Sequence, residues 1–110
     1  MEVCFGPAAQ RELDIASEFY ESRRSGLGDE FLDEVHRHII LLKEHPKLGR
    51  RLFLNRRMLK LNRFPYRLVY VQEEQTIRII AIAHASQRPF YWRHRVEEPR
   101  PTYAVLPAAA

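Results

Sequence analysis

Cysteine and long hydrophobic runs are almost missing from this 110-residue sequence. Cys4 is the single cysteine, so an internal disulfide is excluded. The longest apolar run, residues 79–83, is far too short to cross a bilayer. The first ten residues carry no apolar segment typical of a signal peptide. We therefore expect one domain with a modest core, located in the reducing cytosol and not on a membrane.

Acidic residues are missing from the middle of the chain. None occurs from His45 to Gln72, although eight lysines and arginines fall in this stretch. Residues 1–44 hold ten acids and five bases, whereas residues 45–95 hold two acids and twelve bases. An unneutralised basic cluster attracts phosphate groups or an acidic protein. The alternative interpretation is a solvated face that serves solubility alone.

The second half of the sequence predicts antiparallel strands. Residues 66–71 are aromatic and β-branched, and residues 77–84 form the nearly continuous apolar run of a central strand. Met58–Phe64 alternates well enough to form the strand before them. Alternation along residues 77–84 places four side chains on one face: Arg78, Ile80, Ile82 and His84.

The first half predicts two helices. Pro7 opens the first, which ends near Gly26, and its acids Glu12, Asp14, Glu18 and Glu21 are expected to face outward. Asp29 is the expected N-cap of the second helix, which Pro46 ends. With a short strand at Glu2–Phe5, the order is β-α-α-β-β-β. This predicts an α+β fold, in which a helical hairpin packs on one face of a small antiparallel sheet. A short C-terminal helix or turn follows, and residues 96–110 are expected to be a disordered tail.

The histidines do not predict a metal site. His36, His38 and His45 are two and seven residues apart, so they cannot all share one helical face. We interpret them as surface histidines and expect neither a metal nor another cofactor.

A set of short segments occurs in a specific order between about residues 5 and 95. These are Ala9–Ala16, Phe19-Tyr20, Gly26–Leu32, His45-Pro46, Arg63–Tyr70, Ala81–His84, Arg88-Pro89 and Tyr91-Trp92. In this order they resemble the RelE/ParE toxin superfamily of type II toxin–antitoxin systems, also called the plasmid stabilisation protein family. The resemblance implies a toxin domain over residues 1–95 that causes growth arrest and that a cognate antitoxin neutralises.

The resemblance leaves the target open. ParE-like members inhibit DNA gyrase without catalysis, whereas RelE-like members are metal-independent mRNA interferases that cleave ribosome-bound mRNA. A degenerate, non-toxic member that only binds antitoxin is a further alternative. Operator DNA would be contacted only indirectly, through the antitoxin.

The RNA-cleavage hypothesis names specific residues. Cleavage needs a base, cations that offset charge on the phosphorane, and an acid for the leaving oxygen. His84 and Tyr91 are the candidates for proton transfer, and Arg67 and Arg88 for charge stabilisation. Candidate target-binding residues are Arg56, Arg57, Lys60, Arg63, Arg93 and Arg95. Lysine is scarce and arginine cannot act as a base at neutral pH, which weakens the enzyme hypothesis. Alternatively, His84 is a structural histidine bonded to Tyr91 or to the backbone.

Overall fold

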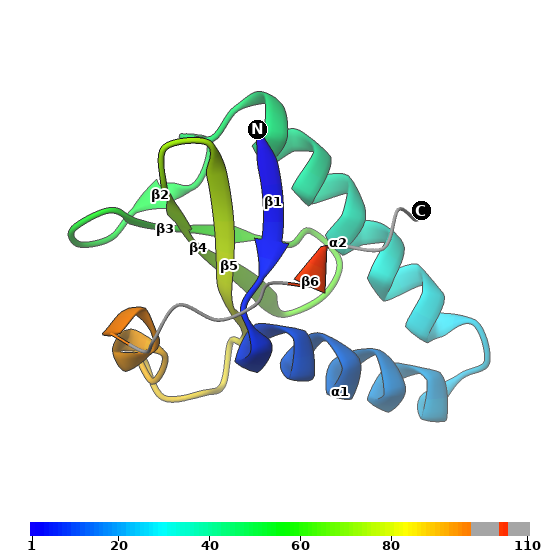
Figure 1. Ribbon diagram of the computed structural model, residues 1–110. Helices are drawn as coiled ribbons and strands as arrows, with labels where there is room; N and C mark the ends of the chain where they lie inside the picture. Colours follow the sequence, from blue (N-terminus) through cyan, green and yellow to red (C-terminus); the bar gives the residue numbers. More distant parts are fainter. Residues whose placement is uncertain (98–103, 106–110) are drawn as a thin grey trace.

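A computed structural model describes residues 1–97 and 104–105 of the chain. A six-stranded sheet carries a helical hairpin on one face (Figure 1). The elements are β1 (Glu2–Phe5), α1 (Pro7–Arg23), α2 (Leu27–Glu44), β2 (Arg50–Arg51), β3 (Arg56–Lys60), β4 (Tyr66–Gln72), β5 (Thr76–His84), the 3-10 helix η1 (Arg93–Glu97) and β6 (Ala104–Val105). The order across the sheet is β2-β3-β4-β5-β1-β6. The predicted α+β fold is confirmed, and β1 lies parallel to β5.

A tight turn joins the two helices, and a side chain of α1 caps the start of α2. Gly26 adopts a left-handed conformation with φ 88°, and α2 begins at the next residue. The predicted N-cap at Asp29 is therefore wrong by one turn. The Glu21 carboxylate accepts the N–H groups of Gly26 (2.9 Å) and Gly28 (3.0 Å), which satisfies donors at the start of α2. A Cβ at Gly28 would lie 2.6 Å from the Ser17 carbonyl oxygen, so only glycine allows this approach of the helices.

The main core lies between the hairpin and the sheet. An aromatic cluster fills one end of it, where Tyr20, Phe31, Phe64 and Tyr66 meet with ring centroids 4.8–6.2 Å apart. Such edge-to-face contacts add to the stabilisation from burial alone. A second, smaller cluster lies on the other face of the sheet and includes Trp92.

A β-bulge in β5 changes which residues face the helices. Val69 pairs with Ala81 but Tyr70 pairs with Ile79, so Ile80 is an extra residue. Ile79 and Ile82 both pack in the main core, whereas Ile80 and Ala81 both pack on the other face. The predicted alternation, which placed Ile80 with Ile82, is therefore wrong beyond the bulge.

The strand β3 begins and ends earlier than the predicted strand over Met58–Phe64. Its last residue is Lys60, because the Glu34 carboxylate on α2 accepts the backbone N–H groups of Asn62 and Arg63. Glu34 is only 2% exposed, so this turn is held from inside the molecule. The neighbouring His38 is also buried, which corrects its interpretation as a surface histidine. Its Nδ1 lies 2.9 Å from the Glu34 carbonyl oxygen.

The C-terminal segment is described only in part. The turn η1 begins at Arg93, and Ala104–Val105 pairs antiparallel with Cys4 and Phe5. The remainder of the predicted disordered tail, residues 98–103 and 106–110, lies outside the described residues. Neither described helix has the length and apolar character that crossing a membrane requires.

We expect Tyr70→Phe to lower the free energy of unfolding by about 1–3 kcal/mol. The buried Tyr70 hydroxyl accepts the Gly49 N–H (2.9 Å) and donates to the Pro46 carbonyl (2.8 Å), so its loss leaves both groups unpaired. Urea unfolding measures the change. The matched control is Tyr66→Phe, a half-buried tyrosine for which we expect less than about 0.5 kcal/mol. Equal effects of the two substitutions would contradict this account.

Candidate functional site

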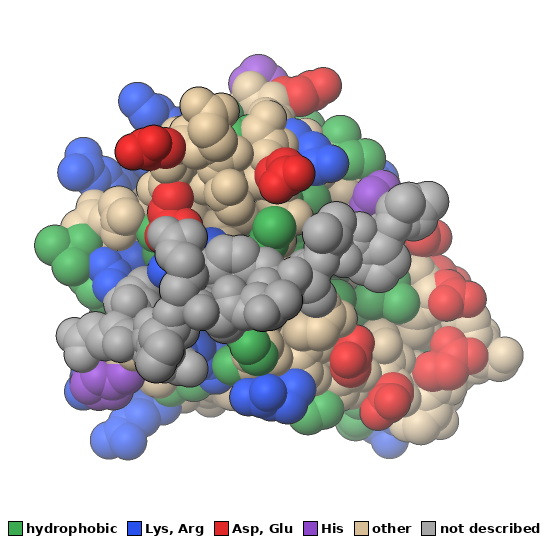
Figure 2. Space-filling model, viewed as in Figure 1, with side chains coloured by type: hydrophobic (Ala, Val, Ile, Leu, Met, Phe, Trp, Pro, Cys, Tyr) green, Lys and Arg blue, Asp and Glu red, His purple; other side chains and the backbone are tan. Residues whose placement is uncertain are grey.

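The sheet face opposite the helices carries basic side chains on three adjacent strands. Directly paired residues of an antiparallel sheet share a face. Arg50 pairs with Met58, Met58 with Val69, and Lys60 with Arg67, so all five project from this side, which we call the open face. Figure 2 shows a group of acidic side chains over the end of the helical hairpin at the right, while at the opposite end several lysines and arginines lie beside other acidic side chains.

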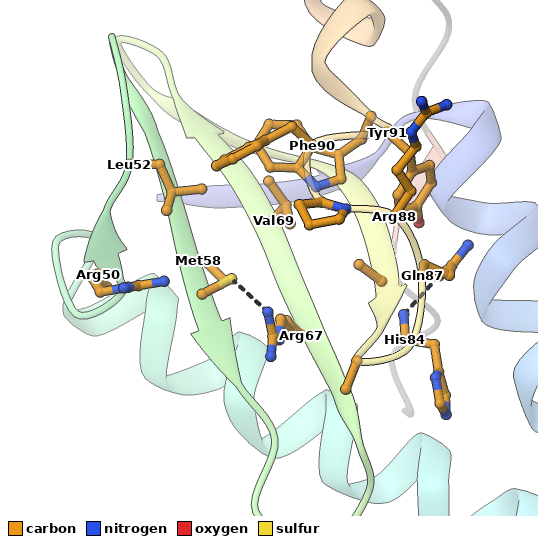
Figure 3. Close-up of a pocket in the computed structure, with 14 residues that line it drawn as sticks. Arg50, Leu52, Met58, Arg67, Val69, His84, Gln87, Arg88, Phe90 and Tyr91 are labelled. Carbon is orange, nitrogen blue, oxygen red and sulfur yellow. Dashed lines mark hydrogen bonds between the residues drawn. The ribbon is translucent and has the colours of Figure 1, made fainter.

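A pocket of about 120 Å³ opens on this face, where the loop after β5 folds over the sheet (Figure 3). Its floor is apolar and consists of Met58, Val69 and Ala83. Phe90 and Trp92 form one wall, with Trp92 stacked on Phe53 at a centroid distance of 5.8 Å. The pocket therefore joins a flat apolar surface to basic groups at its edge.

Two arginines reach toward the pocket and one points away. Figure 3 shows the guanidinium groups of Arg50 and Arg67 directed toward Met58, and Arg67 Nη1 lies 3.9 Å from the Met58 sulfur. Arg88 also lines the pocket, but its guanidinium is turned away from Arg67. Among the residues described, no carboxylate lies within ion-pair distance of Arg50, Lys60 or Arg67.

The His84 ring does not meet Arg67. It pairs in the sheet with Tyr66, whose ring lies against it at 4.9 Å on the helix side, and Figure 3 shows it pointing away from the pocket. Its Nδ1 accepts the Ser86 N–H at 3.0 Å and lies 2.8 Å from the Ser86 hydroxyl. The bulge causes this separation, since it shifts the last residues of β5 to the opposite face.

The Tyr91 hydroxyl is engaged with Glu12 on α1. It donates to the carboxylate at 2.7 Å, and Arg95 binds the same carboxylate through two nitrogens, each at 2.9 Å. Burial, reinforced by the hydrogen bond to Glu12, raises the pKa of Tyr91 above its usual 10.0. Tyr91 therefore holds its proton more firmly than a free tyrosine and is poorly suited to exchange it near neutral pH.

Glu12 and Arg95 also form hydrogen bonds with backbone groups at the edge of β5. β1 stops pairing with β5 after Ile79, and beyond that point Glu12 accepts the Ile82 N–H while Arg95 donates to the Ile80 carbonyl, both at 2.9 Å. The prediction that Glu12 faces outward is wrong, because its side chain is only 20% exposed. The signal in the sequence was its position between Ala9 and Ala16, within the apolar stripe of the helix.

The six predicted target-binding residues do not form one surface. Arg56 is buried with its guanidinium 5.0 Å from the Phe53 ring, and Arg57 donates to two backbone carbonyls. Arg63 pairs with Glu30, and Arg95 with Glu12. Arg93 is exposed on η1, and Lys60 lies on the open face beside Arg67.

We expect Glu12→Gln to destabilise the protein by about 1–3 kcal/mol, because it removes an ion pair and weakens a shared acceptor of four hydrogen bonds. Thermal unfolding measures the loss, and emission from Trp92, the single tryptophan, reports whether the loop shifts. Glu18→Gln, exposed on the same helix, is the control and is expected to change stability by less than about 0.5 kcal/mol. An unchanged melting temperature for Glu12→Gln would contradict the role of this carboxylate.

We also expect stability to fall as the pH rises above 10. Burial raises the pKa of Tyr20, Tyr66, Tyr70 and Tyr91 in the folded state. The unfolded chain loses these protons near pH 10 while the folded chain retains them, so alkaline pH favours unfolding. Urea midpoints between pH 8 and pH 11 test this, and Tyr91→Phe should make the decline shallower. A variant that differs from the wild type equally at every pH would argue against the contribution of Tyr91.

Comparison with known proteins agrees with this architecture. Residues 3–89 match the profile of the family described as "ParE toxin of type II toxin-antitoxin system, parDE". A solved structure titled "Chromosomal ParDE TA system from P. aeruginosa" shares the fold with a TM-score of 0.59 at 20% identity, over 78% of this chain and 97% of that one. No curated protein sequence matches the chain. Since the profile covers most of the sequence, the chain belongs to the ParE toxin family of type II toxin–antitoxin systems.

Proposed function

We propose that this toxin arrests bacterial growth by binding DNA gyrase without catalysis, and that a cognate antitoxin neutralises it. Membership in the ParE family supports the pairing with an antitoxin. The sequence resemblance supports gyrase as the target, because ParE-like members of the superfamily inhibit gyrase.

One observation supports the non-catalytic mechanism. Metal-independent RNA cleavage needs a base, an acid and cations around one phosphate. Here the His84 ring and Arg67 lie on opposite faces of the sheet, and the Tyr91 proton is bonded to Glu12. The groups that such a reaction would use are therefore apart or already engaged, whereas binding a protein target does not require them to meet.

The remaining basic groups fit binding better than proton transfer. Arg50 and Arg67 stay protonated at any physiological pH, so they supply charge but no exchangeable proton. Lys60 is exposed and lies on the open face beside Arg67. These groups can attract and orient an acidic surface without chemistry.

We expect His84→Ala to arrest growth as strongly as the wild type when expressed without antitoxin. The ring contributes to no convergent acid–base pair, so its removal leaves gyrase inhibition intact. Supercoiling of relaxed plasmid by purified gyrase, measured with wild type and variant, is the direct assay. The same preparations are added to translating ribosomes with a reporter mRNA.

The two assays separate the alternatives. Inhibited supercoiling with intact mRNA supports the proposal. Cleaved mRNA that disappears with His84→Ala would replace it with the RelE-like endoribonuclease. Normal growth on expression of the chain alone would leave the non-toxic, antitoxin-binding alternative.

A further inference from the structure

We propose that the open-face pocket is the docking site for an acidic segment of the antitoxin. A carboxylate of that segment binds among Arg50, Lys60 and Arg67, which we call the cationic triad, and a neighbouring bulky apolar side chain packs against Met58 and Phe90. This inference rests on the proposed pairing with an antitoxin and adds where, and through which groups, the antitoxin holds the toxin.

Among the residues described, no acidic side chain forms an ion pair with the triad. Lys60 and Arg67 are directly paired across β3 and β4, and like charges in this position destabilise a sheet. Arg50 extends the same face from β2, its guanidinium directed at the pocket. A carboxylate placed among the three relieves the repulsion, and an arginine can bind it through two nitrogens at once.

Three other basic residues, in β3, in β5 and in the turn between β3 and β4, are already bonded within the protein. Arg57 donates to the carbonyls of Lys47 and Gly49, Arg63 pairs with Glu30, and Arg78 with Glu73. The positive charge available for a ligand on the open face is thus concentrated within a short distance. That suits one or two carboxylates of a protein, whereas a nucleic acid needs cations spaced along its backbone.

One side chain of the apolar wall, Phe90, is 44% exposed. Leu54, which lies in the loop between β2 and β3 and does not line the pocket, is 71% exposed. These two are also the non-glycine residues with positive φ in the described chain, at 59° and 53°. Such conformations are strained for residues other than glycine, and they cluster at functional sites.

The wall is also rigid. Trp92 is 4% exposed and stacks parallel to Phe53, with 5° between the ring planes, while Phe90 packs edge-on against both. A rigid aromatic surface loses little entropy when a partner side chain packs on it. Charge and apolar contact are therefore adjacent, as recognition of an acidic, amphipathic segment requires.

The test uses the full-length toxin and the antitoxin encoded with it. The double variant Arg50→Glu/Lys60→Glu reverses two exposed members of the triad. Its control, Arg11→Glu/Arg37→Glu, changes the net charge equally on the exposed faces of α1 and α2. We expect the triad variant to bind purified antitoxin at least about tenfold more weakly, with a smaller dependence on salt, and the control to bind nearly as wild type. Circular dichroism verifies that both variants are folded.

A second pair of variants tests the apolar contact. Phe90→Ala removes the exposed ring at the pocket, and Phe19→Ala removes a comparably exposed ring on α1. We expect faster dissociation of the antitoxin for Phe90→Ala alone.

Each outcome has one meaning. Equal weakening by the triad variant and its charge-matched control would overturn the docking site, because general attraction between an acidic and a basic protein would then explain binding. Full antitoxin affinity of the triad variant would do the same while leaving the proposed function intact. If the wild-type chain neither arrests growth nor binds the antitoxin, both the proposed function and the proposed docking site are wrong.

Discussion

The Glu12 carboxylate holds together the parts of the molecule that define its open face. It accepts hydrogen bonds from β5, from the loop after β5 and from η1, although it belongs to the first helix. Without it, the free edge of β5 beyond β1 would have unpaired backbone groups. The loop that forms the aromatic wall would also lose its attachment to the helical hairpin. One partly buried ion pair thus connects the helix layer to the opposite side of the sheet.

The bulge at Ile80 has consequences for chemistry as well as for packing. One additional residue rotates the end of β5, so that His84 joins Tyr66 on the helix side while Arg67 stays on the other. A regular strand would have kept His84 on the face of Arg78 and Arg67. A change of one residue in register therefore separates a potential acid–base group from the cations that it would need.

Much of the fold could be predicted from the sequence because it depends on local patterns. Helical spacing in the first half, the aromatic and β-branched run at residues 66–71 and the apolar run at residues 77–84 each have a single strong interpretation. The end of β3 could not be predicted, since it depends on Glu34, some thirty residues away in the sequence. The candidate site was harder still. The sequence names Lys60 and Arg67 as candidate residues, but it does not show their pairing, the bulge or the hydrogen bond from Tyr91 to Glu12, which are tertiary contacts.

The parallel pairing of β1 with β5 determines when this protein can exist in its folded form. Glu2 pairs with Thr76 and Phe5 with Ile79. The strand β1 can therefore form its hydrogen bonds only after residues 76–79 have been synthesised. Closing so long a loop carries an entropic cost that only the completed sheet repays. The helical hairpin can form early, but it has no complete sheet to cover until β5 has left the ribosome. A nascent chain of this toxin therefore has no open-face pocket before residues 76–92 have been synthesised.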